Sequence, residues 1–248
     1  MNLTNPIQPD EGRSQNGAAL VVSGGDGAIF YLLQTLRLPY PTLAIRAGGR
    51  GNALARDLRA IPVHTAQPVT IDLMEVEIEP VEGAPFSRLC ASSVSFGFPT
   101  AVTRTSLRFR SLRRLSYAAA CGVTIPKRQS FQIQYDGGMF ETKTLTGVLI
   151  NNTRHVGGFV AFPHASCHDG HVDAMELRSG YFGQIAHNLS SMSRADLYTP
   201  ARITPITQAE IRPERPQELM LDGELFPSVR AIRLQVRPAA LACYFLEP

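Results

Sequence analysis

The first quarter of the chain alternates continuous apolar runs with glycine-rich turns. Ala18–Ser23 is a run of apolar and β-branched residues, which predicts a strand buried on both faces, as in a parallel sheet. The turn Gly24–Gly27 follows it, and the apolar stretch Ala28–Leu36 then predicts a helix. The same order recurs, with a strand, a glycine turn and a helix expected at Thr42–Ile45, Gly48–Asn52 and Ala53–Arg59. A strand–turn–helix unit that occurs twice indicates an α/β layer of the kind that binds nucleotides.

After Pro62 the pattern changes to short alternating stretches separated by Gly, Pro and Asp turns, which is typical of an antiparallel sheet. Strands are expected at Val69–Leu73, Phe131–Tyr135, Thr144–Ile150 and Ile232–Val236, and helices near Leu112–Cys121 and Phe182–Met192. We therefore expect an α/β plus β fold in two parts. Residues 1–64, rejoined by 238–248, form the α/β part, and residues 65–237 form the β-rich part.

Composition narrows the class of protein. The 248 residues are 44% apolar and 18% charged, which is typical of a compact, soluble protein. The longest apolar stretches are shorter than the ~20 residues that a membrane-spanning helix needs. The four cysteines lie far apart and form no CxxC pair, so we expect no disulfide framework and a cytoplasmic location. A net charge of +3 gives no reason to expect a nucleic-acid partner.

Basic residues are concentrated in the middle of the chain. No Asp or Glu occurs between Gly83 and Tyr135, and five arginines lie within Arg104–Arg114. One interpretation is a solvated helix face or loop. The other is a surface that contacts anionic phosphates or an anionic membrane, where each basic side chain contributes ~1 kcal/mol. Nucleic acid fits less well, because aromatic residues do not interleave with the arginines as they do in a stacking platform.

The two glycine turns are candidate phosphate-binding loops. Glycine lets the backbone approach a phosphate, and successive N–H groups at the end of a buried strand can bind an anion. Arg50 is suited to hold a phosphate through its forked guanidinium, and Asn52 is placed to cap the following helix. Asp26 in such a turn is suited to hold Mg²⁺ or to orient a donor. The same residues also form ordinary tight turns, so either turn alone leaves both interpretations open.

A further turn, Asp222-Gly223-Glu224, places two carboxylates between two strand-like stretches near the end of the sequence. By itself it is an ordinary hairpin turn, which Asp-Gly specifies well. Together with VVSGGDGAIF, AGGRGNALARDL, VSFGF and NNTRHVGGFVAFPHASCHDGHVDAMEL, in the right order, it resembles the diacylglycerol kinase catalytic-domain family. This family of lipid kinases includes bacterial diacylglycerol kinases, sphingosine kinases and ceramide kinases. The resemblance extends from Ala18 to the last residues, and the segment Asn151–Leu177 carries it most strongly.

The resemblance implies a reduced Rossmann-like nucleotide-binding layer followed by an antiparallel β-sandwich-like domain, with ATP and Mg²⁺ bound between them. It implies transfer of the ATP γ-phosphate to the hydroxyl of a lipid, either a diacylglycerol, a sphingoid base or a ceramide. Asp222 is then the general base, Glu224 serves the nucleotide or the metal, and Asp26 is a metal ligand. The ATP site is then lined by Gly24, Gly25, Asp26, Gly27, Gly49, Arg50, Gly51 and Asn52. The lipid would bind in the β-rich part, and Arg104–Arg114 would bring the protein to the membrane periphery.

Several positions depart from the family pattern. The family has GGDGT followed by Asn-Glu, whereas Ala28, Phe30 and Tyr31 stand in those places here. In the second turn Arg50 replaces a Thr and Ala53 replaces an Asp. The family also has a strand–helix–strand–helix section before the first glycine turn, and the residues in front of that turn are too few to form it.

These departures keep a second hypothesis open, namely a relative that binds a lipid or a partner and no longer uses ATP. An NAD kinase-like activity ranks third, because the β-rich half resembles the lipid kinases more closely. The shortened sheet would expose an edge, which predicts a homo-oligomer or a partner protein that covers it.

Overall fold

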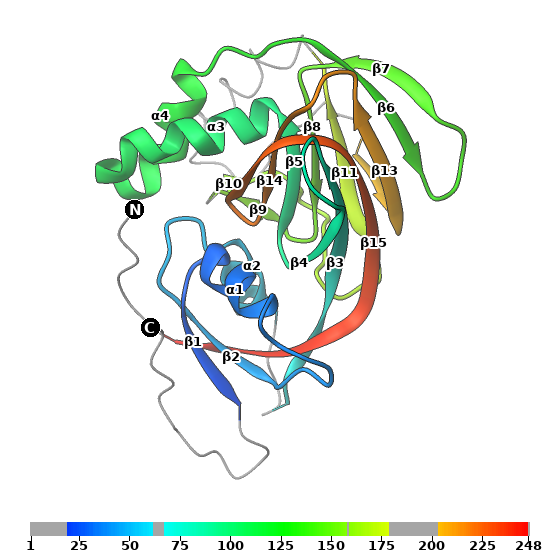
Figure 1. Cartoon of the computed structure of the whole chain (residues 1–248). Coiled ribbons are helices and arrows are strands. Elements are labelled where there is room, and N and C mark those ends of the chain that lie inside the picture. Colours follow the sequence, from blue (N-terminus) through cyan, green and yellow to red (C-terminus); the bar gives the residue numbers. More distant parts are fainter. Residues whose placement is uncertain (1–18, 62–66, 158, 179–202, 248) are drawn as a thin grey trace.

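The computed structural model describes residues 19–61, 67–157, 159–178 and 203–247 (Figure 1). The helix expected at Phe182–Met192 lies outside the described residues. Most of the described chain is antiparallel sheet, and helices are few. The β-rich part of the expected fold class is therefore confirmed.

The first part of the described chain is a pair of parallel strands with two helices. Its elements are β1 (Leu20–Gly24), α1 (Asp26–Leu33), β2 (Leu43–Ala47) and α2 (Ala53–Ala60). Apolar side chains of both helices pack against the strands in one buried cluster. Because β1 and β2 run parallel and in register, with Gly24 opposite Ala47, both glycine turns leave the sheet at the same edge. Helix α1 begins at Asp26, two residues before the expected start.

Antiparallel strands make up the rest of a 13-stranded sheet that also includes β1 and β2. They are β3 (Val69–Pro80), β4 (Phe86–Cys90), β5 (Ser93–Gly97), β6 (Gln129–Tyr135), β7 (Glu141–Leu145), β8 (Gly147–Asn151), β11 (Val172–Leu177), β12 (Ile203–Ile206), β13 (Gln208–Pro213), β14 (Gln217–Leu221) and β15 (Glu224–Leu246). The main path runs β12-β11-β8-β5-β14-β15-β13-β6-β7. A separate two-stranded sheet pairs β9 (His155–Val156) with β10 (Phe159–Val160). Inward-facing side chains of the main sheet form the larger core.

The single strand expected at Thr144–Ile150 is wrong, because the chain forms two strands there. β7 pairs with β6, whereas β8 pairs with β5 and β11. Thr146 lies at the break, where its N–H donates to the Leu177 carbonyl and its carbonyl accepts from the N–H of Phe98. The alternating pattern continues through Thr146, and only these long-range hydrogen bonds reveal that the chain changes neighbours.

A helical arm, residues 98–123, projects beside the sheet (Figure 1). It consists of α3 (Phe98–Ser106), the 3₁₀ segment η1 (Leu107–Leu115) and α4 (Ser116–Val123). A helix is therefore present near the expected Leu112–Cys121, but it begins at Ser116, and the residues before it form a 3₁₀ segment. Arginines spaced four apart, such as Arg104 with Arg108 and Arg110 with Arg114, disfavour a continuous α-helix because like charges repel at that spacing. Within the described ranges, no helix has both the length and the apolar character to cross a bilayer.

Strand β15 connects the two parts of the molecule. It pairs antiparallel with β14, β13 and β3, and its last residues, Cys243–Leu246, pair in parallel with β2. Ile232 and Leu234 lie in the larger core, whereas Leu241 and Cys243 lie in the core beneath α1 and α2. One strand of 23 residues therefore contributes to both cores, and Figure 1 shows it curving from one to the other.

Candidate functional site

The two glycine turns pack on each other where β1 and β2 end. The N–H of Gly48 donates to the Gly24 carbonyl at 2.9 Å, which extends the parallel pairing into the turns. A Cβ added to Gly25 would lie 2.8 Å from the Cα of Gly49, closer than real Cβ atoms approach other groups. Glycine is required at both positions because the two backbones touch. Gly25 and Gly49 therefore have a structural role, whatever ligand the turns bind.

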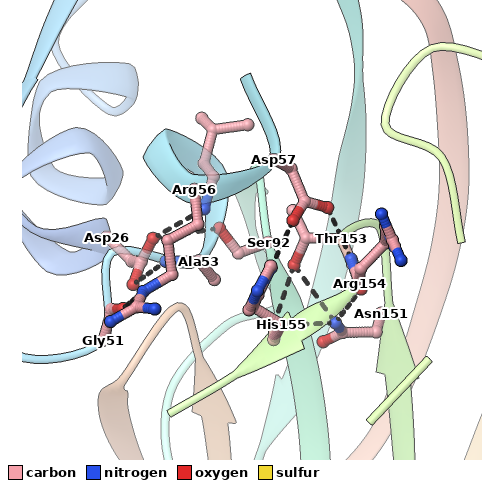
Figure 2. A network of polar contacts seen from close by, with 11 residues as sticks. Asp26, Gly51, Ala53, Arg56, Asp57, Ser92, Asn151, Thr153, Arg154 and His155 are labelled. Carbon is pink, nitrogen blue, oxygen red and sulfur yellow. Dashed lines mark hydrogen bonds and ion pairs between the residues drawn. The ribbon is translucent and has the colours of Figure 1, made fainter. Parts of the chain in front are cut away.

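Asp26 connects the first glycine turn to the second helix (Figure 2). Its carboxylate accepts hydrogen bonds from the N–H groups of Ala53 and Leu54, at 3.0 and 3.2 Å, in the first turn of α2. Burial raises the pKa of Asp26, because desolvation of the charge outweighs these hydrogen bonds. An acid from another element thus satisfies N–H groups that a helix N-terminus leaves free, and its charge suits the helix dipole.

The expectation that Asn52 caps this helix is wrong. Asn52 has a φ of 52°, in the left-handed region, and makes no side-chain cap. Its side chain turns back instead and bonds both the N–H and the carbonyl of Gly49, at 2.7 and 2.8 Å. Asn52 therefore fixes the conformation of the second glycine turn. Asp26, which is distant in the sequence, provides the cap.

Asp222 lies in the turn between β14 and β15 and is only 3% exposed. Its carboxylate accepts four hydrogen bonds, from the N–H groups of Ala91, Ser92 and Ser93 at 2.7–2.8 Å and from the Cys90 thiol at 3.0 Å. Burial raises the pKa of Asp222 to about 6, because desolvation exceeds the stabilisation by these donors, and the Asp26 carboxylate raises it further. Asp222 is therefore mostly ionised at neutral pH and becomes protonated in mild acid.

Glu224, the first residue of β15, lies against the first glycine turn. A Cβ added to Gly27 would lie 2.8 Å from Glu224 Oε1 and 4.0 Å from the Asp222 carbonyl. The hydroxyl of Tyr31 donates to Glu224 Oε2 at 2.8 Å, and this hydrogen bond raises the pKa of Tyr31. Tyr31, which stands where the family has a glutamate, is therefore hydrogen-bonded to the Glu224 carboxylate.

The helical arm forms another side of the site. Arg50 Nη1 donates to the Ser106 carbonyl at 3.4 Å, and the Arg50 guanidinium lies 5.9 Å from the ring centroid of Tyr117. Gly157, with a φ of 56°, packs so tightly on this ring that an added Cβ would lie 2.8 Å from it. Burial raises the pKa of Tyr117, and the nearby Arg50 partly offsets that rise. Arg50 thus joins the second glycine turn to the arm.

A second set of contacts joins α2 to the β-rich part (Figure 2). Asp57, buried on α2, accepts hydrogen bonds from the backbone N–H of Arg154 and bonds Nδ1 of His155. The Asn151 amide in turn donates to the carbonyls of Thr153 and His155, which holds the segment that carries these partners. Asp26 therefore fixes the first turn of α2 to the glycine turn, and Asp57, in the middle of α2, fixes the helix to Arg154 and to the start of β9.

The structure brings the sequence-predicted site residues into one region, formed by the two glycine turns and the β14–β15 turn. These residues are Gly24, Gly25, Asp26, Gly27, Gly49, Arg50, Gly51, Asn52, Asp222 and Glu224. Cys90, Ser92 and Tyr117 belong to no sequence motif, so the sequence did not indicate that they contribute to this region. Tyr31 was visible only as a departure from the family pattern.

Comparison with known proteins identifies the family. Residues 92–245, more than half of the chain, match the YegS C-terminal NAD kinase beta sandwich-like domain. The chain belongs to this family. The resemblance to the lipid kinases found in the sequence is therefore confirmed at the level of the family, and the β-rich part is the β-sandwich-like domain of the YegS type.

Solved structures resemble the chain over most of its length. Three structures of candidate diacylglycerol kinases from Bacillus anthracis Sterne match with TM-scores of 0.68, 0.70 and 0.65 at 17–19% identity, and the match covers 91% of this chain and 76–77% of theirs. Yeast NADH kinase in complex with NADH matches with a TM-score of 0.51 at 13% identity, covering 92% of this chain and 61% of that one. No curated protein matches the chain. At these identities the likeness establishes a shared fold.

Proposed function

We propose that the protein is a lipid kinase that transfers the γ-phosphate of ATP to the hydroxyl of a diacylglycerol, a sphingoid base or a ceramide. The observation that carries this proposal is the position of the last turn against the first: Glu224 and the Asp222 backbone lie beside Gly27, and Ser92 bonds both the Asp222 and the Asp26 carboxylates. This position lies at the edge where two parallel strands end, which is where open α/β sheets bind ligands. Membership of a family of kinases supports the same class of reaction.

In the proposed reaction Asp222 removes the proton of the lipid hydroxyl while that oxygen attacks the γ-phosphorus. The bond from the γ-phosphorus to the bridging oxygen breaks, and ADP leaves with the electron pair. A pKa of about 6 leaves Asp222 ionised at neutral pH, so it can accept the proton. Arg50 supplies a positive charge beside the glycine turns that is suited to phosphate oxygens. Such positioning and charge stabilisation are what phosphoryl transfer requires.

Mg²⁺ fits this site when phosphates share its coordination. Kinases hold Mg²⁺ through one or two carboxylates together with phosphate and water oxygens. Each oxygen of Asp26 already accepts an N–H from α2, and the described part of the chain contains no group of three or more His, Cys, Asp or Glu able to hold a metal. The hydrogen bond of Glu224 is exposed and engages Oε2, whereas those of Asp26 are part-buried and engage both oxygens, so we assign Glu224 the main metal contact, with Asp26 as the second. Bound Mg²⁺ would neutralise phosphate charge.

The test is phosphate transfer from radiolabelled ATP to each of the three lipid classes by the Asp222→Asn variant. We expect loss of lipid-dependent transfer, because an amide cannot accept the proton. Asp136→Asn is the matched control, since Asp136 also precedes a glycine and has a φ of 47° against 48° for Asp222. The control should keep full activity. Unchanged turnover in Asp222→Asn would remove the proposed base.

A second candidate function is a lipid- or partner-binding module that no longer uses ATP. The contact between Tyr31 and Glu224 favours it, because a phenol occupies one oxygen of the carboxylate that should serve the nucleotide or metal. The replacements Ala28 and Ala53 favour it as well, since they remove a hydroxyl and a carboxylate from the turns. Calorimetric titration with ATP, with and without Mg²⁺, separates the two candidates. Binding supports the kinase, and its absence supports the module.

A further inference from the structure

The helical arm and the short loop after it expose several aliphatic side chains on their solvent side. Leu115, Val123 and Ile125 are 57, 60 and 80% exposed, and Leu107 and Leu112 are also exposed. The other side of the arm is already occupied, because Phe98, Val102 and Ala120 pack against β8 and β11. A surface helix normally turns polar residues outward, so apolar residues on both sides indicate a second contact.

The charge around these aliphatic residues is positive. Arg108, Lys127 and Arg128 are exposed, and Arg104 is exposed with an ion pair to Glu218. The sequence has no Asp or Glu from position 83 to 135, so no acid of the arm itself neutralises them. Aliphatic side chains next to basic ones are typical of segments that lie in the interface of an anionic bilayer.

The same arm reaches the candidate site. Ser106 at the end of α3 accepts the hydrogen bond from Arg50, and Tyr117 of α4 contacts Arg50 and Gly157. The exposed aliphatic residues and the site residues therefore belong to one continuous element of 26 residues plus a short loop, residues 98–128. A surface that contacts the exposed residues of this element therefore touches the same element that Arg50 of the second glycine turn contacts.

We propose that residues 107–128 dock the protein on an anionic lipid bilayer, with Leu112, Leu115, Val123 and Ile125 inserted among the acyl chains. Arg108, Lys127 and Arg128 contact the headgroup phosphates. Docking itself is independent of the kinase activity. Its use, to present a lipid headgroup to the site beside Arg50, rests on the proposed function.

The experiment is sedimentation with vesicles of phosphatidylcholine and phosphatidylglycerol in about equal amounts, and with vesicles of phosphatidylcholine alone. We expect binding to the anionic vesicles, which added salt weakens by screening. The variant Val123→Ser/Ile125→Ser should bind the anionic vesicles at least about tenfold more weakly, because it loses two apolar side chains that insert into the bilayer. Arg108→Gln should bind about fivefold more weakly, the contribution of one basic residue near an anionic surface.

Matched variants away from the arm separate docking from general effects of polarity or charge. Met139→Ser removes an apolar side chain that is 88% exposed in the β6–β7 turn, and Arg230→Gln removes an exposed charge on β15. Both should bind as the unaltered protein does. Absence of binding to anionic vesicles, or equal losses in the arm and control variants, would overturn the proposal. So would a dimer in analytical ultracentrifugation that Val123→Ser/Ile125→Ser dissociates, because a second copy would then cover the patch. No ATP or turnover enters the assay, so failure of the proposed kinase leaves its outcome unaffected.

Discussion

The raised pKa of Asp222 makes the stability of the protein depend on pH in a direction opposite to that of a salt-bridged carboxylate. The folded protein keeps the proton until about pH 6, whereas the unfolded chain loses it near the ordinary value of 3.8. Between these values the folded state binds more protons, so its stability falls as pH rises. A shift of about two units corresponds to about 3 kcal/mol. The free energy of unfolding should therefore fall by about 2–3 kcal/mol between about pH 4 and pH 7 because of Asp222.

Asp222→Asn isolates this contribution, because an amide stays neutral over the whole range. Urea unfolding followed by circular dichroism should give the free energy of unfolding of both proteins at several pH values. The quantity of interest is the difference between them, in which the other titrating groups cancel. We expect the unaltered protein to lose about 2–3 kcal/mol relative to Asp222→Asn on going from about pH 4 to pH 7.

Asp136→Asn provides a control with the opposite sign. Burial raises the pKa of Asp136, but hydrogen bonds from Thr207 and Gln208 lower it by more, so the pKa lies below the ordinary value. The unaltered protein should therefore gain stability relative to Asp136→Asn as pH rises through the carboxyl range. A difference for Asp222 that is flat, or that rises with pH, would show that its four hydrogen bonds outweigh desolvation. Asp222 would then not be a base poised near neutrality.

Two further predictions concern the packing of the site. Gly49→Ala should lower the free energy of unfolding by about 1–3 kcal/mol, since its Cβ would collide with the backbone of Gly25. Gly122 lies inside α4 with open space around it, so Gly122→Ala should instead raise the free energy of unfolding by about 0.5–1 kcal/mol. Asp57→Asn should lower the free energy of unfolding by about 1–3 kcal/mol, because one of its two contacts, to the Arg154 N–H or to the His155 ring, loses an acceptor. Chemical unfolding tests both predictions, and the second is wrong if the pair to His155 can be removed at no cost.

Local signals were sufficient for the first part of the fold. The apolar run before Gly24 and the helix formers after Asn52 predicted β1 and α2 closely, because burial and helix propensity act over a few residues. The cap of α2 could not be predicted in this way. It comes from Asp26, which lies a strand and a helix earlier, and only the pairing of β1 with β2 brings it to Ala53.

The sequence predicted which residues form the candidate site, but it did not predict the groups that surround the Asp222 carboxylate. The motifs placed Asp222 and Glu224 near the glycine turns, yet no local pattern shows that three successive N–H groups after Cys90 surround the Asp222 carboxylate. Those contacts depend on the pairing of β14 with β5, which joins segments that are more than a hundred residues apart. The pKa of the proposed base is therefore a property of the sheet and not of the DGE motif.

The long path of β15 has a consequence for how the molecule is made. β2 obtains one of its two neighbours, β1, early in synthesis and the other, Cys243–Leu246, only when almost the whole described sequence has left the ribosome. The layer that is translated first is thus completed last, and one edge of β2 stays unpaired until Cys243–Leu246 is synthesised. Chains that stall or are clipped late in translation would carry every residue of the glycine turns and still lack the strand that holds them in register.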